Sequence, residues 1–66
     1  MEDEVWYFTF GIDSHHKNDI VVIRGDIHST REIMNRRFGS HWAFQYDADE
    51  GLRILKKYDL NLIVVN

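Results

Sequence analysis

The side chains with the broadest chemistry in this 66-residue chain are its histidines, because imidazole binds metals and moves protons near neutral pH. They are His15, His16, His28 and His41. The segment "DSHHKND" places two of them between Asp13 and Asp19, a donor set that suits a transition metal. Adjacent histidines point in different directions, however, and the segment lacks a known metal-binding spacing. We interpret it as a solvated turn and predict no metal site.

Nucleophilic catalysis has little support in the sequence. The chain has no cysteine, and its serines, Ser14, Ser29 and Ser40, fall in expected turns or at a helix start. The four glycines are isolated from one another, so no glycine-rich phosphate loop is present. A chain of this size also has little room for a ligand pocket of ~300 Å³ or more. We predict that the protein is not an enzyme and uses no cofactor.

The first half of the chain has the pattern of a β-hairpin followed by a helix. Residues 5–12 alternate, with Trp6, Phe8, Phe10 and Ile12 on the face expected to meet the core. Polar residues 13–19 then precede a β-branched run, which predicts a hairpin with a long tip. Residues 29–32, "STRE", have the form of a capping box, so we expect a helix to begin with Ser29 as its N-cap and to end at Gly39.

The second half repeats the alternation of strand and helix. Residues 42–46 predict a strand with Trp42 and Phe44 in the core and Tyr46 reaching the surface. Asp47 and Glu50 have the spacing of a second capping box. Gly51 then lies inside the helix at a cost of ~1 kcal/mol, which is tolerable where a neighbouring element packs closely. The final run, "LNLIVVN", is apolar on both faces, as expected of a strand inside the sheet.

These elements predict one domain over residues 1–66 in the order ββαβαβ. The class is α+β, with a small mixed four-stranded sheet and both helices on one face. The chain has no proline and is 44% hydrophobic, which argues against disorder. Its start lacks the pattern of a secretory signal, and no apolar run approaches the ~20 residues that cross a bilayer. We therefore expect a cytoplasmic protein without membrane contact.

Nucleic-acid or nucleotide binding is one functional alternative, although the net charge of −3 gives it no general support. Aromatic strand residues can stack on bases, and the predicted helices concentrate basic side chains. These are Arg31, Arg36, Arg37, Arg53, Lys56 and Lys57. We favour a core role for the aromatics and a solvated helical face for the cations.

Protein binding is the leading alternative, because a few aromatic or arginine anchors dominate interface energy and suit a small aromatic-rich domain. The candidate anchors are Tyr7, Gln45, Tyr46, and His15 and His16 in the hairpin tip. Sheet edges offer a second route, through strand pairing with a partner or with a second copy in a homodimer.

Two blocks of sequence carry a resemblance to a known group. They are "WYFTFG" at residues 6–11 and "FGSHWAFQYDADEGLRILKKYDL" at residues 38–60. In these blocks the chain resembles small proteins encoded by bacteriophages and prophages of low-GC Gram-positive bacteria. The resemblance implies a phage accessory protein that binds and inhibits or modulates a larger host or phage protein, such as a CRISPR enzyme or another defence effector. It supplies no catalytic or ligand-binding residue.

Overall fold

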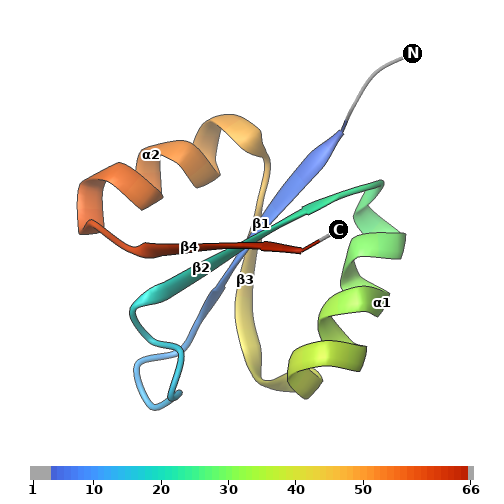
Figure 1. Cartoon of the computed structure of the whole chain (residues 1–66), viewed down its shortest axis with the longest axis horizontal. Helices are drawn as coiled ribbons and strands as arrows, with labels where there is room; N and C mark the ends of the chain where they lie inside the picture. The colour runs from blue at the N-terminus through green and yellow to red at the C-terminus, as the bar shows by residue number, and fades with distance from the viewer. Residues whose placement is uncertain (1–3, 66) are drawn as a thin grey trace.

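The computed structural model describes residues 4–65, apart from the side chain of His41 (Figure 1). The described residues form the predicted succession of strands and helices, and the α+β class is confirmed. The elements are β1 (Val5–Phe10), β2 (Asp19–Arg24), α1 (Ile27–Phe38), a 3-10 turn η1 (Gly39–His41), β3 (Trp42–Tyr46), α2 (Ala48–Tyr58) and β4 (Asn61–Val65).

The described residues form one four-stranded mixed sheet in the order β3-β1-β2-β4. The β1–β2 hairpin occupies its centre, β3 joins β1 in antiparallel pairing, and β4 joins β2 in parallel pairing. The expectation that residues 60–66 form an interior strand is therefore wrong, since β4 is an edge strand. Although β4 is apolar along both faces, only β2 pairs with it, and two of its side chains, Leu62 and Val64, are exposed.

The two helices cover opposite faces of the sheet, so the expectation of both on one face is wrong (Figure 1). Met34 of α1 packs with Phe8 and Phe10, whereas Gly51 of α2 lies against Tyr7, and neighbouring strand residues point to opposite faces. Crossovers between parallel strands are right-handed in nearly all proteins. The crossover from β2 to β3 and the one from β3 to β4 run in opposite directions across the sheet, so the same hand places their helices on opposite sides.

The main core lies between α1 and the sheet. Its buried members come from three strands and one helix: Phe8, Phe10, Val21, Ile23, Met34 and Val65. Trp6 and Trp42 pack against this cluster, and the rings of Trp42 and Phe8 meet edge to face with centroids 5.1 Å apart. The predicted core role of Trp6, Phe8 and Phe10 is confirmed. The same prediction for Ile12 is wrong, because Ile12 lies beyond the end of β1 and is 83% exposed.

A β-bulge separates two aromatics that the alternation of residues 42–46 placed on one face. Phe44 pairs with Thr9, but Trp42 rather than Ala43 pairs with Phe10, so β3 contains one extra residue. Trp42 consequently faces α1, where its indole N–H donates to Asn35 Oδ1 at 2.9 Å. Phe44 turns to the α2 side and is 59% exposed, so its assignment to the core is wrong.

Both helices begin at an aspartate. The Ser29 N-cap is wrong, because Asp26 caps α1 three residues earlier and accepts the Ser29 backbone N–H at 2.7 Å. This hydrogen bond lowers the pKa of the Asp26 carboxyl below its usual 3.8. The Asp47 cap of α2 is confirmed, with the Glu50 backbone N–H at 2.9 Å. The Glu50 carboxylate forms an ion pair with Arg53.

Candidate functional site

The predicted protein-binding residues lie in three separate environments. Tyr7 is only 7% exposed beneath α2, so the prediction that it contacts a partner is wrong. Gln45 lies on the α1 side, where it accepts from Arg31 Nε at 2.6 Å and donates to the Ile27 carbonyl at 3.3 Å. Tyr46 is half-buried on the α2 side, with its ring 6.2 Å from that of Phe44. These side chains do not form one surface.

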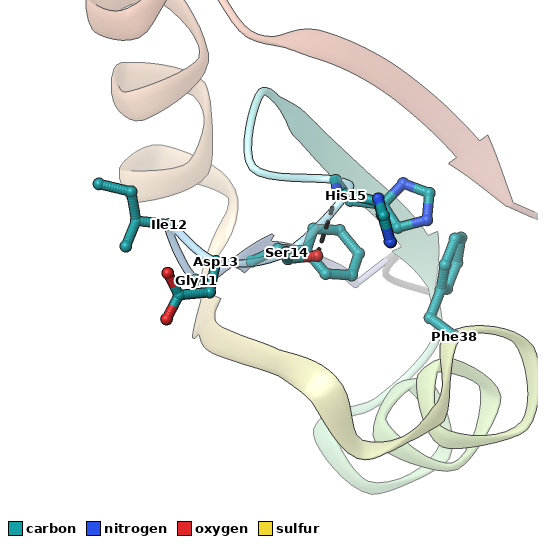
Figure 2. A pocket seen from close by; sticks show the side chains of 8 residues that line it. Gly11, Ile12, Asp13, Ser14, His15 and Phe38 are labelled. Atoms are coloured by element: carbon teal, nitrogen blue, oxygen red, sulfur yellow. Dashed lines mark hydrogen bonds between the residues drawn. The ribbon is translucent and has the colours of Figure 1, made fainter.

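The hairpin tip borders an open hollow of about 720 Å³ beside the end of α1 (Figure 2). The expectation that the chain has little room for a pocket of ~300 Å³ or more is therefore wrong. Phe10 and Phe38 form its aromatic wall, and His16 lies against both rings with centroids 4.9 and 5.4 Å away. Asp19 Oδ2 lies 3.0 Å from His16 Nδ1 and accepts its N–H in the tautomer that carries the proton there. Ile12 is 83% exposed at the mouth.

These contacts make His16 a packed part of the hairpin, whereas His15 is exposed. Among residues 4–65, no three histidine, aspartate or glutamate side chains are placed to hold a metal ion. His28 is exposed on the first turn of α1, and the side chain of His41 lies outside the described part of the chain.

The predicted basic residues are divided between the two faces of the sheet. Three of them belong to α1 (Arg31, Arg36 and Arg37) and three to α2 (Arg53, Lys56 and Lys57). Because the helices lie on opposite sides, these six side chains do not combine into one positive surface (Figure 1). Two members of the α2 set, Arg53 and Lys57, line one hollow with the exposed aromatic residues Phe44 and Tyr58.

An aliphatic surface lies on the α2 side of the sheet, between α2 and the outer edge of β4. Leu62 and Val64 are 47% and 63% exposed, and their pairing with Ile20 and Val22 places them on the face that α2 covers only in part. Leu52 and Leu55 lie on the flank of α2 opposite Ile54, which faces β3. We call the five residues Val22, Leu52, Leu55, Leu62 and Val64 the β4 surface.

Leu62 and Val64 are absent from the predicted binding residues, because their strand was expected inside the sheet. The composition of β4 does, however, indicate an exposed edge that a partner could use. β4 contains no charged residue, and β-sheet edges are usually protected by charge, proline or a bulge. An edge strand with the composition of an interior strand is therefore unprotected.

No protein-family model, curated protein or solved structure matches this chain. Within residues 4–65, neither helix is long and apolar enough to cross a bilayer.

Proposed function

We propose that this domain binds another protein through the β4 surface, with a partner strand added along the outer edge of β4. The observation that supports this function best is the exposure of Leu62 and Val64 on an uncharged edge strand. Between residues 4 and 65 no strand pairs with that edge, so its outward backbone groups are available. Strand addition of this kind takes affinity from main-chain hydrogen bonds and specificity from alternate side-chain pockets.

The energetics favour a partner with apolar side chains at matching positions. Full burial of a leucine or valine is worth about 1.5–3 kcal/mol, so covering these two half-exposed side chains contributes about 1 kcal/mol each. Leu52 lies on the adjacent flank of α2 and is also exposed, which extends the apolar area beyond the strand. The surface therefore offers one hydrophobic strip beside one row of hydrogen-bonding groups.

The class of partner follows from the resemblance to small phage proteins. We propose a larger host or phage protein in the bacterial cytoplasm, such as a defence enzyme, that is inhibited or redirected when its own strand pairs with β4. Self-pairing into a homodimer is the alternative occupant of the same edge. No catalytic role is proposed for any residue.

The test is capture of a partner by tagged protein from a nuclease-treated Gram-positive lysate, with two variants. Val64→Lys puts a charge on the edge strand, which blocks strand addition, and the exposed position tolerates it. Ile12→Lys is the matched control, an exposed aliphatic residue at the hairpin tip. Circular dichroism verifies that both variants fold.

The expected result is one stoichiometric protein retained by the parent and by Ile12→Lys and lost with Val64→Lys. Sedimentation of the purified protein distinguishes the homodimer, which Val64→Lys would convert to a monomer. A partner that binds Val64→Lys as well as the parent would show that β4 is not the binding surface. The absence of both a partner and self-association would overturn the proposed function.

A further inference from the structure

A second hollow lies on the α2 side of the sheet, away from the β4 surface. It measures about 620 Å³, within the ~300–1,000 Å³ range of small-ligand sites. Four parts of the chain meet around it: the end of β1, β3, the flank of α2 that faces β3, and the end of the hairpin tip. Its lining includes three aromatic and three basic side chains, which we call the aromatic pocket: Phe44, Tyr46, Tyr58, Lys17, Arg53 and Lys57.

The pocket exposes aromatic rings that the core does not use. Phe44 and Tyr58 are 59% and 61% exposed, and Lys57 Nζ lies over the Tyr58 ring, 5.4 Å from its centroid. Tyr46 lies beside Phe44 with ring centroids 6.2 Å apart and planes inclined by 34°. Phe44 pairs with Thr9 in the regular part of the ladder, which places it on this face, whereas the adjacent bulge turns Trp42 to the other face. Exposed ring faces are the surfaces on which planar aromatic ligands stack.

Positive charge converges on the same hollow. Lys17 comes from the hairpin tip, and Arg53 and Lys57 come from α2. The one acidic residue that lines the hollow is Glu50, whose carboxylate accepts from Arg53 at 2.9 Å. Both partners of this ion pair are exposed, so the pair is weak and yields readily to a competing anion. The side chains that line the hollow therefore carry a net positive charge, although the net charge of the whole chain is −3.

Aromatic faces and cations in one concave site match a ligand that is both planar and anionic. We propose that the aromatic pocket binds a nucleotide, with the base stacked on Phe44 or Tyr58 and the phosphate held by Lys57, Lys17 or Arg53. The same chemistry is presented by a free mononucleotide and by a nucleotide within a single strand. The hollow beside Phe38 has aromatic walls but no lysine or arginine among its lining residues, so it lacks the second half of this recognition.

The probe is a fluorescein-labelled oligothymidylate of about ten nucleotides, within the ~4–16-nucleotide range of single-strand sites. Fluorescence anisotropy is measured from ~50 to ~200 mM salt, the range over which phosphate contacts are strongly attenuated. Unlabelled thymidine monophosphate is then added in excess. Displacement by the mononucleotide identifies a small-molecule site, and persistence of the oligonucleotide identifies a strand site; either result supports the pocket.

Two pairs of variants locate the binding. Phe44→Leu removes an exposed ring while keeping an apolar side chain, and should weaken binding about 5- to 150-fold, the equivalent of ~1–3 kcal/mol of stacking. Tyr58→Leu tests the same point on α2 if the strand variant folds poorly. Lys57→Gln should lower the salt slope by ~0.7, whereas Lys56→Gln, its exposed neighbour on the helix that does not line the pocket, should leave the slope unchanged.

Absence of oligonucleotide binding at low salt would overturn the proposal. Equal effects of Lys56→Gln and Lys57→Gln, with no effect of Phe44→Leu, would also overturn it, because they would show diffuse attraction to the helix. These measurements involve no protein partner. A negative result in them would not contradict partner binding at the β4 surface, and a failed partner capture would not contradict nucleotide binding in the aromatic pocket.

Discussion

Replacing Gly51 with alanine tests how α2 is seated on the sheet. Gly51 has no positive φ, so the helical backbone accepts alanine, and the substitution alone would gain ~1 kcal/mol of helix propensity. The added methyl, however, would lie 2.6 Å from the Tyr7 Cβ and closer still to Cγ and Cδ1 of the ring. Carbon atoms pack at ~3.5–4.0 Å, so the helix must move away by about an ångström.

The atoms in the way belong to the root of the tyrosine side chain, which no rotation of the ring removes. Overpacking of this kind costs ~1–3 kcal/mol, and its upper end applies where the backbone has to shift. After the gain in propensity we expect a net loss of ~2 kcal/mol. A 66-residue domain has a stability of about 3–10 kcal/mol, so the variant should remain folded and measurable.

The assay is urea denaturation followed by the fluorescence of Trp6 and Trp42. With a slope of ~1 kcal/mol per molar urea, the midpoint of Gly51→Ala should fall by about 2 M. Gly11→Ala is the control, because no atom lies within 4 Å of the added methyl and its midpoint should not change. An unchanged or higher midpoint for Gly51→Ala would refute the close contact between α2 and Tyr7.

The other predictions concern the core and the first helix. In urea melts, Trp42→Ala should lower the free energy of unfolding by about 3 kcal/mol and Phe44→Ala by less than ~1 kcal/mol, since only Trp42 packs on the core. Equal losses would contradict the placement of the two side chains on opposite faces by the bulge. Asp26→Ala should destabilise the protein measurably and Ser29→Ala by much less, because Asp26 caps α1. A larger loss for Ser29→Ala would show that Ser29 is the cap. A carboxyl whose pKa is lowered by folding stabilises the protein above pH 3.8, and this contribution fades as the pH falls through its folded pKa. Thermal melts from neutral pH to pH 3 should therefore show a smaller acid loss for Asp26→Asn than for the parent, and identical acid losses would contradict the assignment.

Local patterns in the sequence predicted the elements because each depends on nearby residues. Alternation identified β1, and the Asp47 cap placed the start of α2. The interior position of Gly51 pointed correctly to a close neighbour, although Tyr7 itself was assigned to the surface. Helix and strand periodicity, caps and glycine positions are all readable over a few residues.

Features that depend on distant pairing could not be predicted in this way. The direction of each crossover decides which face a helix covers, and nothing in the local pattern of α2 records it. The extra residue Ala43 in β3 is visible only in its register with β1, yet it places Trp42 and Phe44 on opposite faces of the sheet. The aromatic pocket was missed for the same reason, since Lys17 and Tyr58 are brought together only by the fold.

The parallel pairing of β4 with β2 also bears on the order in which the chain folds. It joins residues such as Asp19 and Asn61, which are far apart in sequence, whereas the hairpin pairs Thr9 with Ile20. Closing the longer loop costs more chain entropy, so we expect the hairpin to form early and β4 to dock last and open first. Amide hydrogens of β4 should then exchange faster than those of β1. In that case the last strand to join the sheet is also the one that the proposed partner would hold in place.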